Sequence, residues 1–346
     1  MLKSSDDKIT DELLKKTARS IYLVVPLFPQ ALKKPISLAY LFARAIDSIA
    51  DKLIISPAEK LSLIHHLMQM IKTGLYLPEN QQFEQAMHAL QPPENGLLIH
   101  FEHLLEALYQ FDEETRREII WVLEKIEKGI DFDIKTFAST NEITCLATIE
   151  ELDKYTYLVA GDVGEFLTRL SLLKLKYFSH RNPEELYQLS ISGGKGLQLV
   201  NILRDIPDDF KEGRCYFPKQ QLDQFNIKIE DARMNMQLLE PIVLYWRQRA
   251  IKQLRDGWQY MLSINDRGMS GAWAFMLLLG FATLQKLDDS DYLKTREHIK
   301  VNRRLVKVIM LLTALGMVSR RLFWFTRVMK FSSLMFTHEG NLNQEK

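Results

Sequence analysis

Two pairs of aspartates give the clearest chemical signal in the sequence. Asp47 and Asp51 are four residues apart, and Asp205 and Asp209 repeat that spacing with Asp208 beside them. Residues four apart lie on one face of a helix, one turn from each other. Each pair therefore presents two carboxylates to the same side. Mg²⁺ prefers such oxygen ligands and is commonly held by one or two carboxylates together with substrate phosphates.

An arginine lies close to each pair. Arg44 precedes Asp47 by three residues, and Arg204 directly precedes Asp205. A single aspartate pair arises often on solvated helix faces, but two pairs inside apolar segments, each with an arginine, indicate a shared function. Two facing helices of this kind would hold several Mg²⁺ ions and diphosphate groups between them, with the arginines on the phosphate oxygens.

A third segment, residues 151–169, combines tyrosines with glycines. Tyr155 and Tyr157 would stabilise a cation through their rings or relay a proton if they faced a dry cavity. Taken alone, core tyrosines with satisfied hydroxyls are the favoured interpretation. Gly161 and Gly164 interrupt a helical pattern at a cost of roughly 1 kcal/mol each relative to alanine. They indicate close helix packing or room for a bulky apolar ligand.

The elements that position these residues are expected to be helices. Most segments place apolar residues at helical spacing, as at Leu61, Ile64 and Met68, and no run of alternating β-branched residues stands out. With 15 glycines and 11 prolines in 346 residues, turn signals are few. We predict one all-α domain of about ten helices. Breaks are expected near residues 26–29, 55–57, 76–80, 92–96, 182–183, 213–218 and 266–271.

The overall composition excludes several classes of protein. Forty-five basic against 44 acidic residues give a net charge of +1, so no global field recruits nucleic acid. The two cysteines form no disulfide framework or zinc spacing. No signal peptide is visible at the N-terminus, and we expect a cytoplasmic protein. The charge is uneven, because residues 296–346 carry +7 and the first 295 residues carry −6.

Two apolar stretches raise the question of membrane contact. Residues 268–285 contain no charge, and we interpret them as a buried core helix because they include glycines, a serine, a threonine and a glutamine. Residues 308–319 are too short to span a bilayer and are followed by a basic, aromatic segment at 320–327. That region is either a helix on the inner face of an anionic membrane or an ordinary amphipathic terminal helix.

Four blocks appear in a fixed order: Ala18-Arg19-Ser20, residues 44–51, residues 155–164 and residues 198–218. Together they resemble the squalene/phytoene synthase family of head-to-head prenyltransferases, and most of all its bacterial squalene synthases. The resemblance implies a single-domain helical bundle of the isoprenoid-synthase type around a central apolar cavity. It divides the chain into an N-terminal extension (1–14), a catalytic domain (15–305) and a basic amphipathic helix and tail (306–346).

The resemblance also implies a reaction. Two farnesyl diphosphates would condense with Mg²⁺ to presqualene diphosphate, and NADPH would then reduce this intermediate to squalene. A phytoene or dehydrosqualene synthase is the nearest alternative, which loses a proton, needs no NADPH and in one case takes geranylgeranyl diphosphate. A non-catalytic scaffold of the same fold would have no reason to keep both carboxylate pairs.

The family's functional positions fall on specific residues of this chain. Lys300 and Arg303 belong to a late basic segment that would meet either the phosphate of NADPH or a membrane. Tyr155 matches the tyrosine that assists the first half-reaction. The Mg²⁺ positions are Asp47, Asp51, Asp205 and Asp209, with Asp208 as a further candidate, and the substrate-binding positions are Arg19, Ser20, Tyr40, Arg44, Gln198, Asn201, Arg204 and Arg214.

Overall fold

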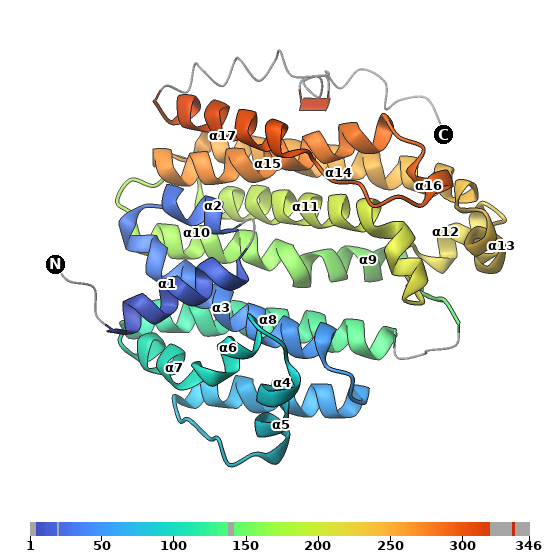
Figure 1. Cartoon of the computed structure of the whole chain (residues 1–346). Coiled ribbons are helices and arrows are strands. Elements are labelled where there is room, and N and C mark those ends of the chain that lie inside the picture. The colour runs from blue at the N-terminus through green and yellow to red at the C-terminus, as the bar shows by residue number, and fades with distance from the viewer. Residues whose placement is uncertain (1–4, 19–20, 138–141, 319–333, 336–346) are drawn as a thin grey trace.

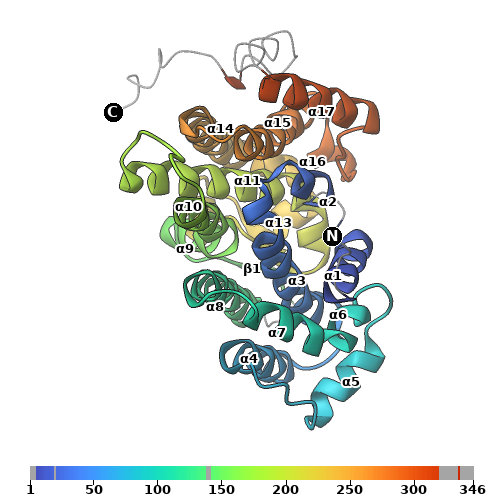
Figure 2. The same cartoon turned by 90° about the vertical axis from the view of Figure 1, so that its left-hand side faces the viewer.

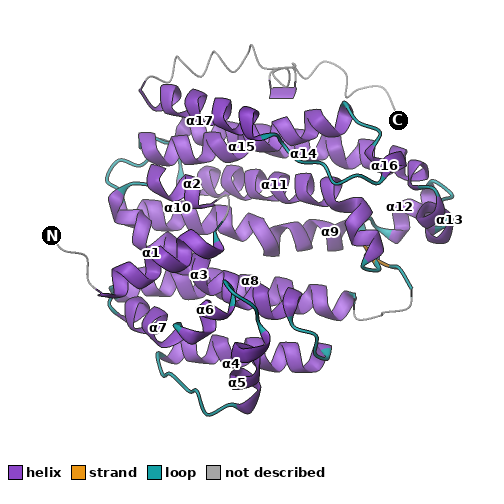
Figure 3. Cartoon of the chain, viewed as in Figure 1, coloured by secondary structure: helices purple, strands orange, loops and turns teal. Residues whose placement is uncertain are grey.

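The computed structural model describes residues 5–18, 21–137, 142–318 and 334–335, and almost all of these are helical (Figure 3). The all-α prediction is therefore confirmed. The described residues form 17 α-helices, of which twelve have eight residues or more. The long helices are α1 (Ser5–Thr17), α3 (Gln30–Lys52), α4 (Pro57–Thr73), α5 (Gln81–Ala89), α7 (Phe101–Tyr109), α8 (Glu113–Thr136), α9 (Ile149–Thr156), α10 (Asp162–Lys174), α11 (Pro183–Lys211), α14 (Glu240–Ser263), α15 (Arg267–Asp288) and α17 (Arg303–Val318).

Short elements connect these helices. A five-residue π-helical turn, η2 (Tyr157–Gly161), joins α9 to α10. The others are α2 (Ile21–Val24), η1 (Val25–Leu27), α6 (Asn95–Ile99), α12 (Lys219–Gln224), α13 (Ile229–Met234), η3 (Met236–Leu239) and α16 (Tyr292–Thr295).

The long helices run side by side across the molecule (Figure 1) and are seen nearly end-on after a quarter turn (Figure 2). Successive contacts link α4 to α8, α8 to α10, α10 to α11, α11 to α14 and α15, and α15 to α17. Helix α3 packs against α8 and α4. Helix α3, which carries Asp47 and Asp51, also contacts α10, and α10 packs against α11, which carries Asp205 and Asp209.

Local sequence signals explain where the helices begin. The Asn182 side chain accepts a hydrogen bond from the Glu184 N–H (2.9 Å), and Pro183 occupies the first turn of α11, as the sequence predicts. Ser56 and Glu59 form a capping box at the start of α4. The predicted breaks at residues 55–57 and 182–183 thus coincide with helix starts.

The sequence gives no sign of a strand, yet the structure contains a two-residue parallel pair. Strand β1 (Thr144–Cys145) pairs in register with β2 (Arg214–Cys215). Two residues are too few for alternation to be visible in a sequence. This small pair matters because it fixes Arg214, and Tyr216 directly after it, beside the bundle.

The long apolar stretch at residues 268–285 lies within α15. By length and composition this helix could cross a membrane, but 78% of its apolar window is buried inside the protein. It packs against α11, α14 and α17. The structure thus agrees with the core-helix interpretation. The basic segment at 320–327 lies outside the described residues.

The expected domain boundaries do not coincide with the ends of helices. Helix α1 crosses the boundary at residue 14, with Leu13 and Leu14 buried in the core. Helix α17 begins at Arg303 and crosses the boundary at residue 306. The division of the chain stays a prediction.

Glycines let the helices around η2 approach closely. A Cβ at Gly164 would lie 2.3 Å from the Ser190 carbonyl oxygen, and one at Gly194 would lie 2.3 Å from the Ala160 oxygen. Contacts this short with backbone atoms cannot be relieved by a side-chain rotation. The glycine pattern at residues 161–164 therefore reflects close packing of α10 and η2 on α11.

We expect Gly164→Ala to lower the free energy of unfolding by about 1–3 kcal/mol, because α10 and α11 must separate to admit the methyl group. Gly96→Ala is the control, since its Cβ would meet only the flexible end of Leu13 at 3.3 Å. Urea denaturation measures both variants. Equal midpoints for Gly164→Ala and the wild type would contradict this packing.

Candidate active site

Both aspartate pairs line one cavity of about 490 Å³. Segments that are far apart in the sequence meet there: α3, the start of α4, α8, α9 with η2, α11 and the β2 strand. The lining residues are Asp47, Ala50, Asp51, Ile55, Pro57, Lys60, Gly129, Ile130, Asp133, Ile134, Phe137, Tyr155, Val159, Gln198, Asn201, Ile202, Asp205, Asp209, Arg214 and Tyr216. The cavity is thus lined by both charged and aliphatic residues.

Burial makes ionisation of the carboxylates in this cavity less favourable. It raises the pKa of Asp47 to about 7, and the neighbouring Asp51 carboxylate adds to the shift. In the same way burial, followed by the Asp205 charge, raises the pKa of Asp209 to about 8. Each helix therefore carries one half-buried carboxylate whose ionised form is disfavoured in the absence of a nearby positive charge.

The partners of these carboxylates differ. The Arg204 guanidinium donates to both oxygens of Asp205 (2.7 and 2.6 Å). Among the described residues, the side chains of Asp47, Asp51 and Asp209 have no hydrogen bond or ion pair. Three carboxylates in one cavity thus remain available to a cation.

The donor set fits Mg²⁺. All candidate ligands are carboxylate oxygens, and they come as two pairs on separate helices. In the described part of the chain, no three His, Cys, Asp or Glu side chains already stand in a ligand cluster. This agrees with Mg²⁺ held by one or two carboxylates plus substrate phosphates, rather than by a closed protein cage.

A chain of hydrogen bonds leads from Tyr155 into the wall of the cavity. The Tyr155 hydroxyl donates to the Tyr216 hydroxyl (3.3 Å), which donates to Oδ1 of Asp133 (2.9 Å). Arg214 donates to the other Asp133 oxygen (3.2 Å), and the two tyrosine rings stack with centroids 4.8 Å apart. Burial raises the pKa of Tyr155 well above its ordinary value, so its hydroxyl stays protonated.

Four functional candidates were missed in the sequence. Asp133 and Tyr216 complete the chain from Tyr155, and Lys60 adds a cation to the cavity lining. His298 lies 2.9 Å from Asp208 and 3.9 Å from Asp205. Tyr216 lies two residues after Arg214, and this proximity was the one available signal. The other three come from distant elements.

Several predicted site residues lie elsewhere. Tyr40 does not line the cavity, because it precedes Asp47 by two helical turns, roughly 10 Å along α3, and its hydroxyl donates to the Thr17 carbonyl (3.4 Å). Arg44 does not line the cavity either, and its guanidinium donates a hydrogen bond to Glu94 (3.0 Å). Arg204 does not line the cavity, and its guanidinium pairs with Asp205 (2.6 Å).

The later basic residues and Asp208 are also outside the lining. Asp208 is a half-buried residue that pairs with Lys211 (2.7 Å) and His298. Lys300 and Arg303 are exposed and do not line the cavity. Gln198, Asn201 and Arg214 do line it, whereas Arg19 and Ser20 lie outside the described residues.

The fold and the paired aspartates define an isoprenoid-synthase-type helical protein. A family model for squalene/phytoene synthases matches residues 14–305, and the chain belongs to this family. The chain is 26% identical over 292 residues to the squalene synthase of Eremothecium gossypii and 28% identical over 282 residues to that of Saccharomyces cerevisiae. These matches cover 81% and 79% of this chain but span only 62% and 60% of the relatives.

Solved structures agree on the fold. A complex of TcSQS with a ligand superposes with a TM-score of 0.74 at 18% identity, covering 97% of this chain and 94% of that one. A dehydrosqualene synthase gives 0.65 at 18% identity, covering 91% and 97%. The squalene synthase HpnC from Alicyclobacillus acidocaldarius gives 0.60 at 16% identity, covering 83% and 96%.

We expect Asp209→Asn to have opposite effects without and with Mg²⁺. The pKa of Asp209 is raised in the folded protein, so its contribution to stability is lost as pH rises from about 4 to 8. At pH 8.5 without metal, the variant should melt roughly 2–4 °C higher than the wild type. With Mg²⁺, the wild type should gain stability and the variant should gain much less.

Thermal unfolding with and without 10 mM Mg²⁺ measures both effects. Asp131→Asn is the matched control, because Asp131 is a half-buried residue of α8 that pairs with Lys135 (2.8 Å) and does not line the cavity. It should behave like the wild type. An equal Mg²⁺ shift in Asp209→Asn and the wild type would rule out Asp209 as a ligand.

Proposed function

We propose that this protein is an enzyme that condenses two farnesyl diphosphates head to head into presqualene diphosphate and converts this intermediate to squalene. The observation that carries the proposal is the convergence of both aspartate pairs and Tyr155 on one cavity. Membership of the squalene/phytoene synthase family supports it. A non-catalytic scaffold would gain nothing from carboxylates whose ionisation lowers the stability of the folded protein.

The polar residues of the cavity would bind the metal and the diphosphates, and the apolar residues would surround the hydrocarbon chains. Asp47, Asp51, Asp205 and Asp209 would hold Mg²⁺, which neutralises charge on a diphosphate leaving group. Gln198, Asn201 and Arg214 would donate hydrogen bonds to diphosphate oxygens. Once the allylic C–O bond ionises, the carbocation needs a dry environment. The apolar part of the wall would supply it through Ile130, Ile134, Phe137, Val159 and Ile202.

Tyr155 would act on the cation and its proton. Tyr155 lines the cavity, its hydroxyl stays protonated because burial raises its pKa, and the hydrogen-bond path through Tyr216 ends on Asp133. The ring face would stabilise developing positive charge. The hydroxyl chain would hold or pass the proton released as the cyclopropane ring closes.

The reductive step has less support from the residues. Lys300 and Arg303, the candidates for NADPH, are exposed and lie outside the cavity lining. They do not fit a nicotinamide cofactor at the cavity, so we assign no residue to hydride transfer. Dehydrosqualene synthase is therefore the second candidate activity.

Product analysis with purified protein, farnesyl diphosphate and Mg²⁺, with and without NADPH, tests the proposed function. We expect squalene only with NADPH and presqualene diphosphate without it. Asp47→Asn should reduce total product at least 100-fold, because removal of a group that stabilises developing charge costs about that much. Asp131→Asn should retain activity.

Other outcomes would redirect the assignment. Dehydrosqualene regardless of NADPH would establish the second candidate activity in place of the first. Product from geranylgeranyl diphosphate alone would identify a phytoene synthase. Inertness with both substrates would contradict an enzymatic function.

We also propose that α17 rests on the surface of an anionic membrane on the cytoplasmic side. Its solvent face exposes Val308, Leu311 and Val318, and basic residues lie at its start: Arg303, Arg304 and Lys307. The opposite face packs on α15, where Met317 meets Gly271. Apolar residues on the outer face with cations beside them suit the interface of an anionic bilayer.

Sedimentation with anionic liposomes at low salt tests this surface. We expect the wild type to co-sediment and Leu311→Glu to bind at least five-fold less, because Leu311 is 60% exposed on α17. Leu75→Glu is the matched control, since Leu75 is 61% exposed and follows α4, at the opposite end of the molecule (Figure 1). Equal binding of both variants would exclude α17 as the contact.

A further inference from the structure

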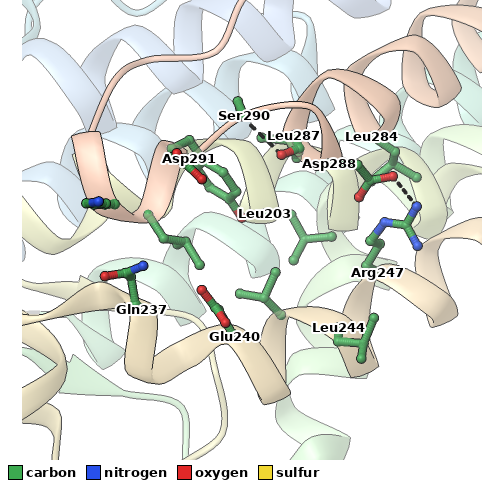
Figure 4. Close-up of a pocket in the computed structure, with 14 residues that line it drawn as sticks. Leu203, Gln237, Glu240, Leu244, Arg247, Leu284, Leu287, Asp288, Ser290 and Asp291 are labelled. Atoms are coloured by element: carbon green, nitrogen blue, oxygen red, sulfur yellow. Dashed lines mark hydrogen bonds and ion pairs between the residues drawn. The ribbon is translucent and has the colours of Figure 1, made fainter.

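A second cavity lies beside α11, outside the site described above. It measures about 310 Å³ and lies between η3, α14, the end of α15 and α16 (Figure 4). Leucines, among them Leu203 of α11, form much of its lining, and Arg247 and Asp288 form an ion pair there. Neither of the two cysteines of the chain lines this cavity. The thiols lie instead at the β1–β2 strand pair.

The two cysteines are far apart in the sequence but are neighbours in the structure. Cys145 of β1 and Cys215 of β2 are partners in the register of the parallel pair. Neighbouring strands lie about 4.8 Å apart, and side chains of opposite residues point to the same face. That separation falls within the roughly 4.4–6.8 Å between Cα atoms over which disulfides form. The strand pair therefore holds the two thiols where a disulfide can close.

The two thiols differ in accessibility and acidity. Cys145 is half-buried, whereas Cys215 is only 1% exposed. Hydrogen bonding with Cys215 lowers the pKa of the Cys145 thiol against the opposing effect of burial, and the Lys219 charge acts in the same direction. Burial raises the pKa of Cys215. Cys145 is thus the thiol that solvent reaches and that ionises first, as in an attacking cysteine, and Cys215 is the resolving partner.

The cysteine pair adjoins the aspartate cavity. Arg214 and Tyr216, on either side of Cys215, both line that cavity. The Tyr216 hydroxyl lies 3.3 Å from that of Tyr155 and 2.9 Å from Asp133. A disulfide needs Cβ atoms about 3.5–4.5 Å apart, closer than the roughly 4.8 Å between strands. Closing the bond would therefore move β2 toward β1 and carry Arg214 and Tyr216 with it.

We propose that Cys145 and Cys215 form a reversible disulfide when the protein meets a peroxide. The Cys145 thiolate attacks one peroxide oxygen, the O–O bond breaks, and the other oxygen leaves as water after protonation. The Cys215 thiol then attacks the resulting sulfenic acid, so that the S–S bond forms, the S–O bond breaks and a second water leaves. Two thiols are oxidised and one peroxide is reduced. A dithiol reductant reverses the reaction, and in a reducing compartment such a bond is transient.

Mass spectrometry of the full chain after treatment with hydrogen peroxide tests the disulfide. The peroxide is removed with catalase, and free thiols are alkylated with iodoacetamide after unfolding. We expect the wild type to lose both alkylated sites and to regain them after dithiothreitol. Cys215→Ser removes the resolving thiol, so Cys145 should accumulate as a sulfenic acid that dimedone traps.

Two outcomes would overturn the proposal. One is that both thiols of the wild type stay free under conditions that oxidise glutathione completely. The other is a disulfide that joins two copies of the chain, which a non-reducing gel separates from one within a single chain. Neither measurement depends on catalytic activity.

Turnover of farnesyl diphosphate measures the effect on the cavity, and this part rests on the proposed function. We expect the oxidised wild type to form product roughly five-fold more slowly than the reduced protein, because small displacements of substrate-positioning groups are costly. Dithiothreitol should restore the rate. Cys145→Ser is the matched control, since it keeps every methionine but cannot form the disulfide, and its rate should not change with peroxide.

The two measurements separate the two proposals. An inactive reduced protein would contradict the proposed function, while mass spectrometry would still decide whether the disulfide forms. Equal rates for the reduced protein and for the protein with the disulfide formed would contradict the displacement of Arg214 and Tyr216.

Discussion

The site depends on like charges held close together in a cavity. The carboxylate of Asp47 lies near that of Asp51. In the same way, the carboxylate of Asp209 lies near that of Asp205. Burial and like charge both oppose ionisation, which is why both pKa values rise. A fold tolerates this cost only if the surrounding helices are stable without the site. The large buried core of α11, α14 and α15 provides that stability.

The packing that supports the aspartates is set by small residues. Gly164 and Gly194 let α10 and η2 lie against the backbone of α11, so that Tyr155 reaches the same cavity as Asp205 and Asp209. The β1–β2 pair anchors Arg214 and Tyr216 on the other side. Tyr155, Tyr216 and Asp133 then form one buried network, whose members depend on one another for their hydrogen bonds.

Helix α11 separates two cavities of different chemistry. Its aspartates and amides face a charged cavity, while Leu203 faces an aliphatic one.

The sequence alone determined the helical class, several of the breaks between helices and the two aspartate pairs, because periodicity, capping and i, i+4 spacing are local properties. It also indicated Tyr155 and Arg214 through their motifs. Only the tertiary structure placed Asp133 and Lys60 in the cavity and turned Tyr40 and Arg44 away from it. Those outcomes depend on which distant groups, such as Thr17 and Glu94, come within reach once the helices pack.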